Sequence, residues 1–172
     1  FDRLFCIGVL QHTPNPEKTF YGLTKFVKPG GYLAADVYRR HPWWRQMWNT
    51  RYWVRPITKR MNPKRLYHWC EWYVHAVWPL VKLIHRLPFG TTINAKLLVP
   101  EFLGVYAFSS EHHQKAWALL HLFDWLSPRY DKPQTIPIVR QWVEDAGLEE
   151  IEVHLGYGGI EGRGRAPLYG GD

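Results

Sequence analysis

The clearest structural pattern of this chain lies in residues 1–38, which read FDRLFCIGVLQHTPNPEKTFYGLTKFVKPGGYLAADVY. From Leu4 onward the first ten residues are mainly apolar, as in a strand that is covered on both faces. Residues 11–16 cannot continue that strand, because Pro14 and Pro16 lack an N–H group and have a fixed φ. The pattern therefore predicts a strand followed by a loop.

A helix, a tight turn and a second strand follow this loop. Phe20, Leu23 and Val27 are three and four residues apart, which predicts a helix over residues 17–27 with one buried face. The Lys-Pro-Gly-Gly sequence at 28–31 supplies the turn, and Tyr32–Tyr38 forms the second strand.

Two strands that are joined by a helix should lie parallel, with a right-handed crossover. Open parallel sheets bind ligands beyond the carboxyl ends of their strands. The topology therefore places a candidate site at residues 11–15 and 36–39. Many classes of enzyme share this architecture, so the chemistry has to come from the residues themselves.

These residues resemble the second half of a class I S-adenosylmethionine-dependent methyltransferase. In that family an aspartate opens the fourth strand, as Asp2 does here, and a leucine-x-histidine-x-proline loop follows, as at residues 10–14. A lysine-proline-glycine-glycine turn then leads into the fifth strand, as at residues 28–31. The resemblance is strong over residues 1–38 and 127–164, where an Ala-Gly-Leu helix end also fits, and weak between them.

The resemblance implies an α/β fold with a Rossmann-like methyltransferase sheet, truncated at the N-terminus, and a helical insert after the second visible strand. It implies S-adenosyl-L-methionine as the cofactor and a small-molecule or lipid-like methyl acceptor. The residues that would pass under the methionyl part of the cofactor are Gly8, Val9, Leu10 and Gln11. Among them, Gly8 would allow the backbone a close approach.

His12 stands where many members of the family place a histidine near the methyl group, which makes it the candidate catalytic residue. The alternative is that His12 braces the loop through backbone groups near Pro14. Asp36 and Tyr38 end the next strand as candidate substrate-binding residues, although Asp36 could equally cap the following turn.

Arg129, Tyr130 and Asp131 lie next to one another in a proline-bounded loop and are further candidates for substrate binding. Arg129 can hold an acidic substrate with its planar guanidinium group, and Tyr130 or Asp131 could bind a hydroxyl of the acceptor. The alternative is a local ion pair that fixes the loop. No metal site is expected, because the histidines of the chain lack the spacing and the partners of a zinc site.

The chain begins within an expected strand, so we expect it to be a fragment. The resemblance implies a glycine-rich loop and a ribose-binding acidic residue that this sequence does not contain. The glycines at 156–159 and 162–164 come late and open no helix, so they fail the dinucleotide fingerprint. We therefore expect the fragment itself to be inactive.

The net charge of +7 is concentrated in one segment. From Arg39 to Arg86 there are eleven Lys or Arg residues and one acid, Glu71, together with seven of the ten tryptophans. We therefore divide the chain into the C-terminal part of a cofactor-binding sheet at 1–38, a basic Trp-rich helical insert or cap at 39–126, and a closing loop, helix and strands at 127–172.

The insert has four interpretations. It could cap a substrate pocket, lie on an anionic membrane through residues 39–86, bind nucleic acid, or pack with a solvated basic face. We favour the cap, then peripheral membrane contact. Nucleic acid comes last, because no RNA-binding motif occurs.

Prolines divide the insert into a helix at 41–52, a basic connector at 55–63 and a bent helix at 64–87. Residues 91–105 are ambiguous, and 110–126 is helical. Helix faces are expected to be buried at two sets of positions: Leu66, Trp69, Tyr73, Val77, Leu80, Leu83, Ile84 and Leu87, and then Trp117, Leu120 and Phe123.

The closing part is expected to hold a helix at 137–146 that ends at Gly147. A strand exposed on one face follows at 148–155, and residues 160–165 form an antiparallel edge strand.

The sequence is compatible with two classes of function. One is a methyltransferase, and the other is a catalytically inactive, methyltransferase-like binding module that uses the basic aromatic insert. A nicotinamide dehydrogenase fits the sheet but not the histidine-proline loop. Because Cys6 and Cys70 read as reduced core thiols and no signal peptide or membrane span occurs, a cytoplasmic location is expected, with membrane association as the alternative.

Overall fold

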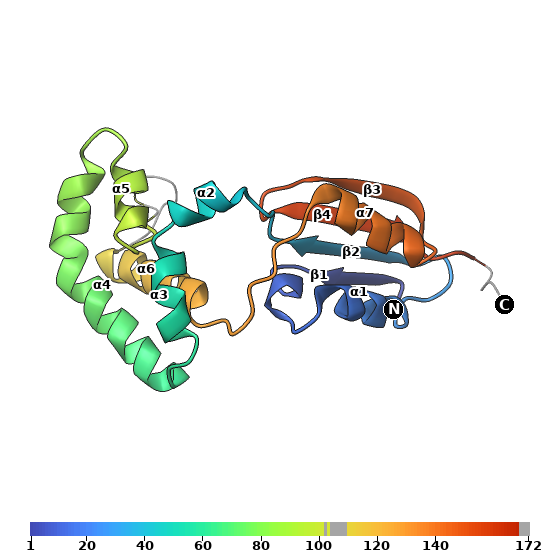
Figure 1. The fold of residues 1–172 in the computed structure, drawn as a ribbon, viewed down its shortest axis with the longest axis horizontal. Coiled ribbons are helices and arrows are strands. Elements are labelled where there is room, and N and C mark those ends of the chain that lie inside the picture. The colour runs from blue at the N-terminus through green and yellow to red at the C-terminus, as the bar shows by residue number, and fades with distance from the viewer. Residues whose placement is uncertain (102, 104–109, 169–172) are drawn as a thin grey trace. The chain divides into compact units, whose positions relative to one another are not determined.

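The computed structural model describes residues 1–101, 103 and 110–168, without the side chains at 45 and 46, and divides into two compact units (Figure 1). Unit 1 consists of Phe1–His41 together with Tyr130–Asp172. Unit 2 is the inserted segment Pro42–Arg129. The units divide after residues 41 and 129, each three residues later than the divisions after 38 and 126 that the sequence predicted.

Unit 1 is built on a mixed sheet of strands in the order β1-β2-β4-β3, which confirms the α/β class. The strands are β1 (Arg3–Cys6), β2 (Tyr32–Val37), β3 (Glu149–Leu155) and β4 (Ile160–Arg165). As expected, β1 and β2 are parallel, whereas β4 is antiparallel to both of its neighbours.

The prediction that residues 160–165 form an edge strand is wrong. Strand β4 lies between β2 and β3, and β3 is at the edge. Two glycines of β4 make this interior position possible. A Cβ atom at Gly162 would lie 2.9 Å from Val139, and one at Gly164 would lie 2.8 Å from Leu148. Side chains there would push away the packing that covers the strand.

The expectation that the first strand is covered on both faces is also wrong. Strand β1 ends at Cys6, and Phe5 and Ile7 are 70% and 59% exposed. Leu4 and Cys6 alone in this strand pack against the core. An apolar run does not reveal which neighbours cover it, and within the described part of the chain β1 pairs only with β2.

Helices α1 (Pro16–Thr24) and α7 (Ile136–Asp145) cover one face of the sheet (Figure 1). Asn15 caps α1 by accepting a hydrogen bond from the N–H of Lys18. Leu4 and Cys6 of β1 pack against a core beneath the two helices that consists of Leu10, Phe20, Leu33, Ala35, Val37, Val139, Trp142, Val143, Leu148, Val153 and Ile160. It holds β1 and β2 in fixed register, and so it fixes the loops that follow them.

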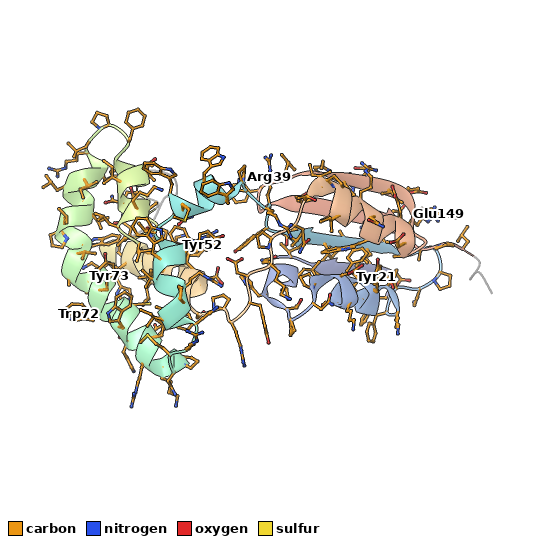
Figure 2. All side chains as sticks on the ribbon, in the orientation of Figure 1. Tyr21, Arg39, Tyr52, Trp72, Tyr73 and Glu149 are labelled. Atoms are coloured by element: carbon orange, nitrogen blue, oxygen red, sulfur yellow. The ribbon has the colours of Figure 1, made fainter. Side chains whose placement is uncertain are left out.

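Unit 2 contains α2 (Trp43–Met47), α3 (Arg51–Thr58), α4 (Pro63–His85), α5 (Gly90–Lys96) and α6 (Glu111–Leu126). Part of the ambiguous segment 91–105 is α5, and positions 102, 104 and 105 lie outside the described residues. Figure 2 shows Tyr73 on α4, where its hydroxyl donates to the carbonyl of Leu97 at 2.6 Å.

The basic segment 55–63 is not a simple connector, because residues 51–58 form helix α3 in spite of Pro56. The buried guanidinium group of Arg55 donates to the carbonyls of Trp125, at 2.7 Å, and Pro128, at 3.0 Å. Thr58 donates to the carbonyl of Leu126 at 3.0 Å. These bonds join α3 to the end of α6, and tertiary contacts of this kind override a weak local helix propensity.

The core of unit 2 lies between α4 and α6, along stripes that differ from the predicted ones. The buried residues are Leu66, Cys70, Val74, Trp78 and Val81 of α4, with Ala118, Leu119, Leu122 and Leu126 of α6. Leu80, Leu83, Leu87 and Leu120, which were expected to be buried, are about half exposed. Among the helices described, none has both the length and the apolar composition needed to cross a bilayer.

Candidate functional site

Three segments of unit 1 meet beyond the carboxyl ends of β1 and β2. They are the loop after β1, the residues that follow β2, and residues 130–134. The N–H of Lys132 donates to the carbonyl of Gln11 at 2.9 Å, and its ammonium group donates to the carbonyl of Pro14 at 2.6 Å. The N–H of Gln134 donates to the carbonyl of Tyr38 at 2.8 Å. Backbone bonds thus tie together segments more than ninety residues apart in sequence.

Asp36 holds the start of the loop after β1. Its carboxylate is 7% exposed and accepts a hydrogen bond from the N–H of Gly8 at 2.5 Å. Asp36 was expected either to bind substrate or to cap the turn that follows it. Instead, its carboxylate caps the loop at Gly8, 28 residues earlier in the chain. The pKa of the neighbouring Cys6 thiol is raised, first by burial and then by the negative charge of Asp36.

Gly8 has a φ of +72°, and apart from its two chain neighbours no atom of the described residues lies within 4 Å of the position that a Cβ would occupy. Only glycine adopts this backbone region without strain, and the space beside it is open. Of the other three residues predicted to line the cofactor, Val9 is half exposed and Leu10 has its side chain in the core of unit 1. Leu10 can therefore offer a ligand only its backbone.

The two ring nitrogens of His12 have different surroundings. Its Nδ1 atom lies 3.1 Å from the carbonyl oxygen of Tyr130, and its ring meets that of Tyr38 edge-on at 5.4 Å between centroids. A carbonyl oxygen only accepts, so Nδ1 must carry the proton. In the neutral ring Nε2 is then the acceptor. That buried Nε2 has no hydrogen-bond partner among the residues that the structure describes.

Gln11 has a fully buried side chain. Neither its amide nitrogen nor its amide oxygen has a partner within the described parts of the chain. Buried amides are nearly always paired, because an unpaired polar group in the interior costs about 1–3 kcal/mol. Within the described residues, two successive side chains, those of Gln11 and His12, therefore contain buried polar atoms without a hydrogen-bond partner.

The predicted group of Arg129, Tyr130 and Asp131 is divided between the units. Tyr130 and Asp131 belong to unit 1 and join the site, whereas Arg129 is the last residue of unit 2. The structure also adds two residues that sequence reasoning missed, Lys132 and Gln134. Lys132 directly follows Asp131 inside the same proline-bounded loop, so the loop was predicted but the role of this lysine was not.

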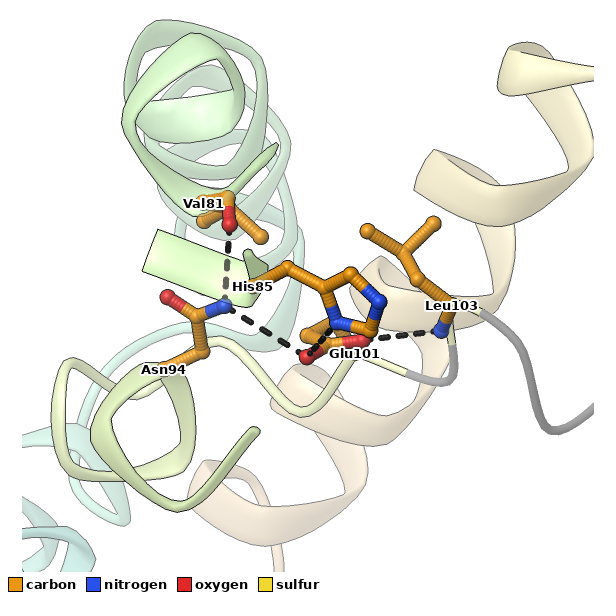
Figure 3. A network of polar contacts seen from close by, with 5 residues as sticks. All are labelled: Val81, His85, Asn94, Glu101 and Leu103. Carbon is orange, nitrogen blue, oxygen red and sulfur yellow. Dashed lines mark hydrogen bonds and ion pairs between the residues drawn. The ribbon is translucent and has the colours of Figure 1, made fainter. Parts of the chain in front are cut away.

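Unit 2 contains a separate polar network that the sequence did not reveal (Figure 3). The Glu101 side chain is fully buried, and its carboxylate accepts from Nδ1 of His85 at 2.9 Å and from the N–H of Leu103 at 2.8 Å. The Asn94 amide lies 3.5 Å from the same carboxylate and donates to the carbonyl of Val81 at 3.0 Å. The network joins α4, α5 and the segment after α5, which marks it as an architectural element of unit 2.

No group of three or more metal-ligating side chains converges in the part of the chain that the structure describes. Of the histidines considered for a metal, His121 stacks edge-on with Trp117 at 5.2 Å, and burial lowers its pKa. Comparison of the chain with protein-family models, with curated proteins and with solved structures finds no match.

Proposed function

We propose that this chain carries the second half of a Rossmann-like methyltransferase, which transfers a methyl group from S-adenosyl-L-methionine to a small-molecule or lipid-like acceptor. One observation carries the proposal. Polar groups of Gly8, Gln11, His12 and Asp36 gather beyond the ends of two parallel strands that are joined by a helix. That is where open parallel sheets bind ligands, and it is where the motifs that resemble the family lie.

The residues present fit the methionyl part of this cofactor. The open space beside Gly8 admits a ligand close to the backbone. The orphaned amide of Gln11 offers one donor and one acceptor, which suits a group with a carboxylate and an ammonium. When bound, the cofactor supplies a methyl group on a sulfonium, which is already activated for in-line displacement. The chain's own part is to align the acceptor and exclude water.

His12 is the residue that handles the proton in this proposal. The carbonyl of Tyr130 keeps the proton on Nδ1, so the lone pair of Nε2 is ready to accept a proton from a hydroxyl or amine of the acceptor. The edge-on contact with the ring of Tyr38 limits rotation of the His12 ring. An imidazole suits this role because one ring nitrogen can accept a proton while the other keeps its own.

The alternative is a methyltransferase-like binding module without turnover. The observation that favours it is the basic, tryptophan-rich surface of unit 2, which has no part in methyl transfer as proposed here. Binding of S-adenosylhomocysteine together with methyl transfer distinguishes the enzyme from this alternative.

The test uses the product of the complete gene, because these 172 residues contain no glycine-rich loop between a strand and a helix. Titration calorimetry with S-adenosylhomocysteine should show binding that Gly8→Val abolishes, since valine fills the open space and is strained at positive φ. Gly22→Ala is the matched control, because its Cβ also meets open space but on α1, away from the loop.

His12→Asn should leave binding of S-adenosylhomocysteine intact and lower methyl transfer by a factor of about 10²–10⁴, the usual contribution of a general base. Absence of binding by the unaltered protein would refute the proposal. Binding without transfer to any acceptor of the proposed class would establish the inactive module.

A further inference from the structure

The charged residues of the segment from Pro42 to Arg65, at the start of unit 2, are all basic. It contains seven Lys or Arg residues and no Asp or Glu, and the next acid along the chain is Glu71. Arg55 is buried in bonds to carbonyls, but Lys59 and Arg60 are exposed at the end of α3. A stretch of this length without an acid attracts anions, because no local carboxylate neutralises it.

The same segment exposes large apolar side chains. Trp53 and Ile57 are four residues apart on α3, so they share one face, and they are 64% and 69% exposed. Trp43 and Met47 are likewise four apart on α2 and are 75% and 59% exposed. The indole N–H of Trp53 donates to the carbonyl of Met47 at 2.9 Å, which brings the end of α2 against the outer face of α3.

The opposite face of α3 explains why these side chains point outward. Arg55 and Thr58 anchor that face to the end of α6, so the helix cannot turn its apolar side inward. The outer surface is therefore a fixed apolar patch, which we call the α2–α3 patch: Trp43, Trp44, Met47, Trp48, Trp53 and Ile57. Contiguous exposed apolar surface of this kind marks an interaction site.

We propose that the α2–α3 patch, with Lys59 and Arg60 beside it, binds the surface of an anionic lipid bilayer. Tryptophan prefers the boundary between headgroups and acyl chains, and basic side chains reach the phosphates around it. The aliphatic side chains of Met47 and Ile57 gain from insertion into lipid, whereas they offer no ring on which a nucleic-acid base could stack. The proposal does not depend on methyl transfer.

The test is co-sedimentation of the protein with vesicles of phosphatidylcholine alone and with phosphatidylglycerol added. Binding should require the anionic lipid and weaken with salt. Neutralising one cation near an anionic bilayer lowers affinity about fivefold, so Lys59→Glu with Arg60→Glu should lower it at least about 25-fold. Lys18→Glu on α1 with Lys25→Glu at its C-cap makes the same change of charge in unit 1 and should have a much smaller effect.

The apolar contribution is tested with Trp53→Ala combined with Ile57→Ala, which should lower the vesicle-bound fraction at least tenfold. Trp72→Ala is the matched control, because Trp72 is as exposed as Trp53 but lies on α4, beside the acidic Glu71 (Figure 2). Circular dichroism of each variant confirms that its helices are retained.

Three results would overturn the proposal. The first is a protein that binds neither kind of vesicle. The second is binding to neutral and anionic vesicles with equal affinity, since charge would then have no role. The third is binding to a single-stranded oligonucleotide, lost in both double variants, at concentrations where anionic vesicles do not bind. That result would assign the surface to nucleic acid.

Discussion

Replacement of Glu101 by alanine tests the polar network of unit 2 most directly. The carboxylate is fully buried and accepts two short hydrogen bonds, from His85 and from the N–H of Leu103. A hydrogen bond to a charged group contributes about 1.5–3 kcal/mol, and breaking a buried pair costs about 3–5 kcal/mol. Because His85 is one-third exposed and water can solvate it, we expect Glu101→Ala to lower the free energy of unfolding of unit 2 by about 3 kcal/mol, the low end of this range.

Glu71→Ala is the matched control, because it also removes a carboxylate that faces a histidine. The Glu71 and His68 side chains are 46% and 76% exposed, and an exposed pair contributes less than about 1 kcal/mol. Glu101→Gln should fall between the two, because the amide keeps one acceptor but places a donor against another donor.

Urea unfolding followed by tryptophan fluorescence measures these changes in the free energy of unfolding. Nine of the ten tryptophans belong to unit 2, so the signal reports on that unit. An equal loss of stability in Glu101→Ala and Glu71→Ala would refute the reasoning that burial makes the Glu101 contacts strong.

Other predictions concern thiols and glycines. Asp36→Asn should lower the pKa of the Cys6 thiol, which burial and then the Asp36 charge raise, so Cys6 should react faster with a thiol reagent near pH 8. Burial raises the pKa of Cys70 to about 12, so a thiol reagent should not label Cys70 until unit 2 unfolds. Only the unfolded thiol ionises near pH 9, so the free energy of unfolding of unit 2 should fall as the pH rises above 9. Gly22→Ala should raise the melting temperature of unit 1, because the helix gains about 0.5–1 kcal/mol and the methyl group meets no atom. Gly90→Ala should lower the melting temperature of unit 2 sharply, because its Cβ would clash with the backbone oxygen of Ile84.

Local signals in the sequence were enough to predict the strand, helix and strand that begin unit 1. The spacing of apolar residues, the proline loop and the glycine turn all act over a few residues. The position of β4 was not predictable in this way, because Gly162 and Gly164 read as edge glycines until the packing of α7 against them is known. The helical state of α3 also escaped prediction, since it depends on the bonds of Arg55 to residues seventy positions away.

The candidate site was predictable in outline because the ends of parallel strands must meet. His12 and Asp36 were identified for that reason, and the structure brings both into one unit with Tyr130. The partners of these residues were not predictable. The bond between Asp36 and Gly8 and the bond between Tyr130 and His12 join residues far apart in sequence, so no local spacing of residues indicates them. Burial of Gln11 also depends on the packing of distant segments.

The way in which Arg55 joins α3 to the end of α6 has a consequence for the order of folding. Unit 1 cannot complete its sheet until the chain closes over the 88 residues from Pro42 to Arg129. Closing a flexible loop of that length costs about 4 kcal/mol in the length-dependent part of its entropy.

If unit 2 folds first, the bonds from Arg55 and Thr58 to residues 125–128 bring its two ends together. The loop that remains open shrinks to roughly fifteen residues, and the entropic cost falls by about 1.5 kcal/mol, a factor of about ten in rate. Folding of the inserted helices would then speed up formation of the sheet, whose strands lie before and after them in the sequence. Refolding of unit 1 should become slower whenever Arg55 is replaced.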